Sequence, residues 1–245
     1  MPGADAIATA VPALIFAAVF LLGRRLYPLQ AFGFDRRSLV SFGAGMATAY
    51  VFVHVMPELQ GARRALVESA SRPLRYEGMA VYVVALLGFM GFYALDHLRT
   101  RLRMSAAPDR DRASFRLHVG GFAAYVALVG YLLVRNLEET PVSIGLYTAA
   151  MAFHFVGVDH SLNEEHGQRY DTTGRYVLAA MALAGWAIGQ LTALSQAWVA
   201  LLLAFLSGAV ILNSSLMELP SDKDGRLWPF LIGGLLYASI LLPLG

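Results

Sequence analysis

Long apolar stretches alternate with short polar segments along nearly the whole chain. At about 1.5 Å per helical residue, each stretch reaches across, or nearly across, a hydrocarbon core of roughly 30 Å. We therefore expect an all-α, polytopic membrane protein with about eight transmembrane helices. The stretches cover residues 6–22, 39–55, 79–95, 117–134, 142–158, 176–194, 197–217 and 227–244.

The composition supports a membrane location, because 57% of the residues are hydrophobic and only 15% are charged. A soluble core could not bury this much apolar surface. Residues 1–245 are thus predicted to form one integral membrane domain, with the lipid bilayer as its partner. The chain has no cysteine, so any metal ligand must come from His, Asp, Glu, Asn, Met or backbone oxygen.

The basic residues predict the orientation of these helices, since Lys and Arg are retained on the cytoplasmic side. The segments after the first, third, fifth and seventh stretches carry 14 of the 19 Lys and Arg residues. Both termini should therefore be extracytoplasmic, and the loop at 97–116 should be cytoplasmic. Arginine is used almost to the exclusion of lysine, which favours a GC-rich genome and hence a bacterial inner (plasma) membrane. Because topology accounts for the basic residues, no nucleic-acid partner is predicted.

Ionisable side chains gather at the end of the fifth stretch, in the run DHSLNEEH at 159–166. If the helix continues through this run, several imidazoles and carboxylates share one arc of about 160°. An imidazole and a carboxylate four residues apart, as at His160 and Glu164, form a usual two-ligand clamp for zinc. The predicted metal ligands are His154, Asp159, His160, Glu164 and His166. The alternative is an ordinary solvated helix end, which the following Gly167 and Arg169 favour.

A proline precedes a carboxylate in the run H-V-M-P-E, from His54 to Glu58, at the end of the second stretch. Proline frees backbone carbonyls in a helix, and a carboxylate beside it can open a mouth that attracts cations. Glu218 lies in a similar run, M-E-L-P, at the opposite face. We expect His54, Glu58 and Glu218 to act as gates where a cation enters or leaves.

Together these features resemble the ZIP (Zrt/Irt-like) family of divalent-metal transporters. The resemblance rests on the eight stretches with outward termini, the longer third loop, and the motifs at Gly43 to Glu58 and Ser207 to Pro220. It implies a ZIP-like bundle that transports a divalent metal ion as its substrate, zinc first and iron or manganese next. It implies neither an organic cofactor nor an enzymatic activity, and it allows a homodimer. The spacing of Gly185 and Gly189 would suit such a close helix contact.

The chain departs from the family at the paired metal site that ZIP proteins carry in their fourth and fifth helices. The matching register of the fourth helix, Tyr125 to Gly130, supplies no ligand at the three ligand positions. In the fifth helix, the register from His154 to Asp159 keeps one ligand of three. A register from His160 to Glu165 keeps two but lies at the cytoplasmic edge. The resemblance therefore implies a degenerate metal site.

Two other classes of function stay open from the sequence alone. One is a membrane-embedded metal hydrolase, in which Asp96, His97, His118 and His160 would hold a metal-bound water. The other is a membrane scaffold or sensor without transport, in which the polar end of the fifth helix would be a docking face.

Overall fold

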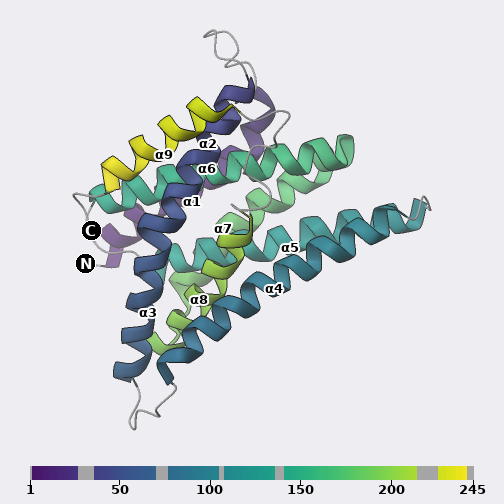
Figure 1. The fold of residues 1–245 in the computed structure, drawn as a ribbon. Helices are drawn as coiled ribbons and strands as arrows, with labels where there is room; N and C mark the ends of the chain where they lie inside the picture. The colour runs from purple at the N-terminus through teal and green to yellow at the C-terminus, as the bar shows by residue number, and fades with distance from the viewer. Residues whose placement is uncertain are drawn as a thin grey trace.

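A computed structural model describes residues 2–26, 36–69, 77–104, 108–135, 141–213 and 226–241 of the chain (Figure 1). Within these ranges the chain is helical apart from short turns, and it contains no strand. The all-α fold class is thereby confirmed. Each predicted apolar stretch falls largely on a helix, as far as its residues are described.

The helices follow one another closely along the chain. In chain order they are α1 (Pro2–Leu26), α2 (Arg36–Tyr50), the π-helical η2 (Val51–Val55), α3 (Met56–Ser69), α4 (Glu77–Arg103), α5 (Pro108–Arg135), α6 (Pro141–His166), the π-helical η3 (Tyr170–Gly174), α7 (Arg175–Leu191), α8 (Gln196–Asn213) and α9 (Leu227–Leu241). Three described segments are long and apolar enough to cross a membrane, namely Gly78–Arg103, Asp109–Arg135 and Gln196–Asn213. Shorter apolar helices run over Ile7–Gly23 and Leu227–Ile240.

Helix α4 lies at the outside of the helical assembly. Only 17% of the 18-residue apolar segment of α4 is buried, against 61% of the corresponding segments of α5 and α8. Its outer face carries Val83, Leu87 and Met90, which are each more than half exposed. A large apolar face of this kind is unusual on a soluble monomer, so α4 is compatible with a lipid environment.

The segment 97–116, predicted to be a loop, is helical wherever the structure describes it apart from the turn at Met104. It forms the last turns of α4 and the first turns of α5. The ion pair between Asp96 and Arg99, three residues apart, supports the end of α4. Helix α5 starts with a proline and has two acidic residues in its first turn, and both features favour a helix N-terminus. Hydropathy alone does not reveal these polar helix ends.

The chain also stays helical beyond the H-V-M-P-E motif. At η2 the backbone N–H of Met56 donates to the carbonyl of Val51, which is the wider π-helical spacing. The next residue, Pro57, has no N–H to donate, and the π turn just before it lets the helix continue into α3. Such single π turns are frequent at functional sites, and this one carries His54.

Three helix pairs share one mode of close packing, in which a glycine of each helix faces a backbone carbonyl of the other. In every pair that carbonyl belongs to the residue three positions before the partner glycine, and an added Cβ would overlap it. The glycines are Gly45 and Gly233 between α2 and α9, Gly88 and Gly208 between α4 and α8, and Gly130 and Gly185 between α5 and α7. The two helices of each pair run in the same direction, so these are small-residue crossings between parallel helices.

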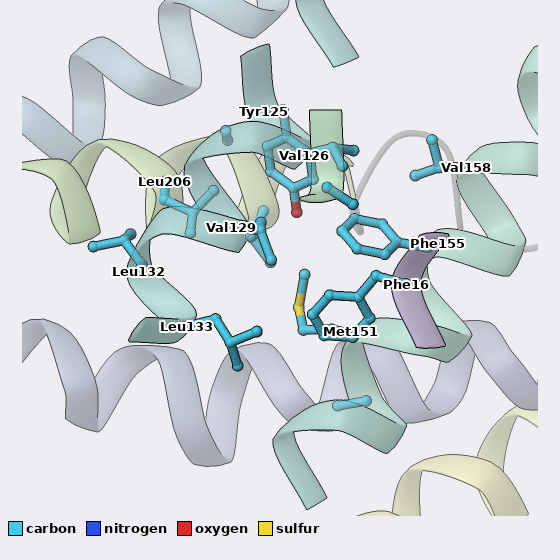
Figure 2. Close-up of a cluster of buried hydrophobic side chains, with 14 of the residues drawn as sticks. Phe16, Tyr125, Val126, Val129, Leu132, Leu133, Met151, Phe155, Val158 and Leu206 are labelled. Atoms are coloured by element: carbon cyan, nitrogen blue, oxygen red, sulfur yellow. The ribbon is translucent and has the colours of Figure 1, made fainter. Parts of the chain in front are cut away.

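The interior between α5 and α6 is filled by large side chains (Figure 2). Phe16 of α1 packs edge-on against Phe155 of α6, with ring centroids 5.2 Å apart. Met151 of α6 and Tyr125 of α5 are also almost fully buried beside them. One polar contact, between Tyr125 of α5 and His154 of α6, lies within this apolar interior.

Candidate metal site

Two imidazoles and one carboxylate meet where the start of α5 faces the end of α6. His118 Nδ1 lies 3.0 Å from His166 Nε2 and 3.4 Å from Glu165 Oε2. His166 Nε2 lies 4.0 Å from Glu165 Oε1. One ligand atom from each of the three residues falls within 4.8 Å of the other two. This cluster of His118, Glu165 and His166 is the candidate metal site.

These spacings suit a small metal ion. In tetrahedral zinc sites with bonds of 2.0–2.1 Å, neighbouring ligand atoms are about 3.3 Å apart. The separation of 3.0 Å between the two imidazole nitrogens and that of 3.4 Å from His118 to Glu165 Oε2 are close to this value. His166 is 4.0 Å from the other oxygen of Glu165, Oε1, so the carboxylate must turn or shift to place one oxygen near both rings. The side chains of His118, Glu165 and His166 are 1%, 9% and 5% exposed, so an ion here would be largely removed from water.

The end of α6 fixes the position of two of these ligands. Glu165 and His166 are its last two residues, and Gly167 then takes a left-handed conformation with φ of 52°. The N–H of Gly167 donates to the carbonyl of Asn163 over 2.8 Å, which closes the last turn. Glycine adopts this left-handed conformation without strain, so Gly167 ends α6 directly after the two ligands.

Burial lowers the pKa of the His166 imidazole below its usual value near 6.5. The positive charges of Arg99 and Arg103 lower it further, while Glu165 acts in the opposite direction. The ring is therefore neutral at pH 7, which is the form that binds a metal. Its Nε2 lies 3.0 Å from His118 Nδ1, and an ion bound between the two nitrogens would replace this hydrogen bond.

Helix α4 contributes arginines to the same cluster. Arg99 donates to Glu165 Oε2 and also, over 2.8 Å from Nε, to Asp96 Oδ1. Arg103 lies 3.3 Å from Glu165 Oε1. The carboxylate of Glu165 is thus shared between two imidazoles and two guanidinium groups, which compensate its charge in a buried place.

His154, the most central predicted ligand, contacts a different partner. Its Nε2 lies 2.9 Å from the hydroxyl of Tyr125, and both side chains are buried. Tyr125 and His154 are the first positions of the two registers that the family comparison of the sequence aligned. The partner of His154 in the interior is therefore the phenol of Tyr125. At this position the ZIP pattern would have a second metal ligand.

Asp159 is buried against α1 and η3. Tyr170 donates to its Oδ1 over 2.7 Å, and only 1% of the residue is exposed. Gly23 of α1 lies so close that a Cβ there would overlap the carboxylate. Nearby, Asn163 donates to Asp171 over 2.8 Å, which Arg175 also binds. This polar network joins α6 to η3 and α7.

His160 and Glu164 form the predicted pair, with His160 Nε2 3.3 Å from Glu164 Oε1. Glu164 is 62% exposed and His160 16%, so the carboxylate of this pair faces outward while its imidazole is part-buried. Of the five predicted metal ligands, only His166 enters the convergent cluster. The arc of 160° predicted for the run at 159–166 is wide enough to face several neighbours, and its side chains point toward α1, α5, η3 and the exterior. Metal binding by the other four stays a prediction.

Glu165 is not among the metal ligands predicted from the sequence, and His118 appears there only in the hydrolase hypothesis. A signal for Glu165 was present, because it follows His154 by 11 residues, or about three helical turns, and so shares its face. His118 could not be paired with it before α5 and α6 were known to meet.

Two of the three predicted gate residues, His54 of η2 and Glu58 of α3, lie in the described part of the chain. His54 Nε2 lies 3.8 Å from Glu58 Oε2, and the His54 ring stacks on Tyr50 with centroids 5.1 Å apart. Glu218 lies outside the described residues. Whether His54 and Glu58 pass an ion stays a prediction.

Of the four residues of the hydrolase hypothesis, Asp96 and His118 line one cavity, whereas His97 and His160 contact other partners. Asp96 binds Arg99, His97 is exposed and stacks on Tyr93, and His160 pairs with Glu164. Only His118 belongs to the candidate metal site. The site is thus defined by its own geometry, since comparison of the chain with protein-family models, with curated proteins and with solved structures gives no match.

Proposed function

We propose that this chain is a polytopic plasma-membrane protein that binds a divalent metal ion at His118, Glu165 and His166 and transports it in the manner of a ZIP carrier. The observation that carries the proposal is the convergence of two imidazoles and a carboxylate from two helices at one end of the bundle. Two histidines with one glutamate form a frequent zinc ligand set, and iron and manganese accept the same donors. Zinc is therefore the first expected substrate.

The orientation predicted from the arginines supports a role in release or capture of the ion inside the cell. With both termini outside, the candidate metal site lies at the cytoplasmic end of α5 and α6. The gate residues His54 and Glu58 lie toward the opposite side on this topology. An ion could then pass between two polar ends of the same bundle.

The interior between these ends supports alternating access rather than an open pore. Phe16, Met151 and Phe155 fill it with nearly fully buried apolar side chains. His154 and Asp159 are buried polar groups on α6, along the way to the metal site. An ion that crosses must displace or rearrange the apolar side chains, as carriers do when helices rock against each other.

The resemblance to ZIP proteins supports relocation of the metal site toward the cytoplasm. The hydrogen bond between Tyr125 and His154 occupies the level where the family holds its metal ions. The nearest set of metal-ligand atoms on the same two helices is the cluster at His118, Glu165 and His166. The fold class needed for this function, an all-helical bundle with apolar helices of spanning length, is present.

In this mechanism His118 and His166 offer neutral imidazole nitrogens, and Glu165 supplies the negative charge that favours a cation over water. The ion exchanges its hydration shell for these three ligands and keeps an open position for water or a fourth group. Weak enough binding to release the ion again is as necessary as binding itself, and the neighbouring arginines limit the affinity.

The test is metal binding by the purified protein in detergent, measured by calorimetry and by elemental mass spectrometry. Wild type should bind about one zinc per chain, and the variant His118→Ala/His166→Ala should lose about 100-fold or more in affinity. The matched control is His160→Ala/Glu164→Ala, which removes a part-buried imidazole and an exposed carboxylate outside the cluster and should bind as wild type does.

Uptake of zinc into proteoliposomes should follow the same order among these variants. Absence of binding in wild type, or equal loss in the control, would contradict the metal site. Binding without uptake would contradict transport and leave a membrane metal sensor as the better account.

A further inference from the structure

Glu165 has two sets of partners that compete for the same oxygen atoms. Its Oε2 accepts from Arg99 and is also the oxygen nearest to His118 Nδ1, at 3.4 Å. Its Oε1 lies 3.3 Å from Arg103 and 4.0 Å from His166 Nε2. An ion held by His118, His166 and Glu165 would therefore sit directly beside two guanidinium groups.

The charges around the site are balanced before any ion binds. Asp96 and Glu165 carry two negative charges, and Arg99 and Arg103 carry two positive ones, all in contact. Adding a divalent cation leaves an excess of two positive charges in a partly buried place, where like charges repel strongly. The repulsion between the ion and the guanidinium groups falls if one of these groups moves away from Glu165.

Arg99 has a second carboxylate partner, Asp96, with which it can stay paired when its contact with Glu165 is lost. It already contacts Asp96 Oδ1 through both Nε, at 2.8 Å, and NH2, at 2.5 Å. Asp96 is on the same helix as Arg99, whereas Glu165 is on α6. If the ion pair between Arg99 and Glu165 breaks, the carboxylate of Asp96 still compensates the charge of Arg99 within α4.

We propose, on the basis of the metal site proposed above, that Arg99 and the metal ion are alternative partners of Glu165. Ion binding displaces Arg99 from Glu165 onto Asp96 and weakens the link between the cytoplasmic end of α4 and the end of α6, which Arg103 then keeps alone. In the metal-free protein Arg99 holds the carboxylate in place, so the same residue keeps the site formed and sets its affinity.

This exchange links the ion to the arrangement of the helices. Helix α4 packs on α3, α5 and α8, whereas α6 packs on α1, α2 and η3. The ion pairs of Arg99 and Arg103 with Glu165 bridge these two groups of helices at the cytoplasmic end. An ion would therefore loosen α4 against α6 while it joins α5, through His118, to Glu165 and His166 of α6.

The first test compares zinc affinity among charge variants of α4. Arg99→Gln should bind zinc about tenfold more tightly than wild type, and Asp96→Asn should bind more weakly, because it removes the alternative partner of Arg99. Arg101→Gln is the matched control, since Arg101 lies on the same helix, is exposed and removes the same charge. It should stay within about twofold of wild type.

The second test follows the helix ends directly, with spin labels attached at Arg101→Cys and Gln168→Cys in the otherwise cysteine-free chain. Zinc should lengthen or broaden the measured distance in this double variant. Adding Arg99→Gln should produce that distribution without zinc. This measurement also shows whether Arg99→Gln keeps the fold.

The outcomes separate this inference from the proposed function. Wild type that binds zinc, with Arg99→Gln equal to or weaker than Arg101→Gln, would overturn the exchange and keep the metal site. Zinc binding by Arg99→Gln but not by wild type would support the exchange and overturn transport by the unmodified chain. Absence of binding in every variant would overturn both.

Discussion

The contact between Tyr125 and His154 is a buried polar pair within an apolar core, and its strength can be measured. Removal of the hydroxyl in Tyr125→Phe takes a hydrogen-bond partner from His154 Nε2. The free energy of unfolding should fall by about 1–3 kcal/mol, because a buried polar atom loses a partner. Denaturant unfolding in detergent measures this change.

A double-mutant cycle with His154→Phe isolates the pair. The combined variant Tyr125→Phe/His154→Phe should lose less stability than the two single variants together, because both polar partners are removed at once. Tyr176→Phe, at an exposed position, is the control and should be neutral. Strict additivity would show that the hydrogen bond contributes nothing.

At the same scale, His166 should make stability depend on pH. Burial lowers its pKa, so the unfolded chain binds more protons at this residue than the folded chain when the pH falls below about 6.5. Its contribution to stability is therefore present at neutral pH and is lost as the medium becomes acidic.

Unfolding at about pH 7.5 and at about pH 5.5 checks this expectation in the metal-free protein. Wild type should lose more stability on acidification than His166→Gln. His97→Gln, which removes an exposed imidazole, should behave like wild type. An equal pH effect in wild type and His166→Gln would remove His166 as its source.

Helix α6 shows what the sequence could and could not predict. Its apolar stretch predicted the helix, and the polar run at 159–166 continues it to His166, as the ligand hypothesis required. The neighbour of each side chain was out of reach, because it depends on which helices pack on each face. Asp159 meets α1 and η3, whereas His166 meets α5. Spacing along one helix defines an arc, and only the packing of several helices defines a site.

The glycine crossings give a prediction for pairs of helices. A Cβ on Gly208 would overlap the carbonyl of Ala85, so Gly208→Ala must push α8 and α4 apart. We expect a loss of about 1–3 kcal/mol in the free energy of unfolding, as for overpacked cores. Denaturant unfolding in detergent or lipid discs measures the difference.

Two glycines with open surroundings serve as controls for this substitution. Nothing lies within 4 Å of a Cβ built on Gly91 of α4 or Gly120 of α5. Gly91→Ala and Gly120→Ala should be neutral or stabilise the helix by up to about 1 kcal/mol. Equal effects at Gly208 and Gly91 would show that the close crossing does not limit the packing.

For the whole molecule, hydropathy predicted the helical class and the apolar parts of the described helices, and the structure agrees on both. Hydropathy missed α3 and the polar ends of α4 and α5. It did not predict that α2 pairs with α9, α4 with α8 and α5 with α7. Apolar stretches of similar composition do not differ in a way that shows which helices pack together. The spacing of Gly185 and Gly189 had suggested a contact such as a dimer interface. Both glycines instead face α5 of the same chain. A homodimer stays a prediction, for which the exposed apolar face of α4 has room.

The three glycine crossings also determine an order of assembly. The partners are nested like brackets, with α5 and α7 inside α4 and α8, which in turn lie inside α2 and α9. During synthesis the innermost pair is complete first, whereas α2 must wait for the last described helix before its glycine crossing can close. Helix α1 can already pack on α6 and α7, whereas the glycine crossing of α2 closes only with α9. Until α9 arrives, the groove of α2 around Gly45 stays open to lipid or to chaperones.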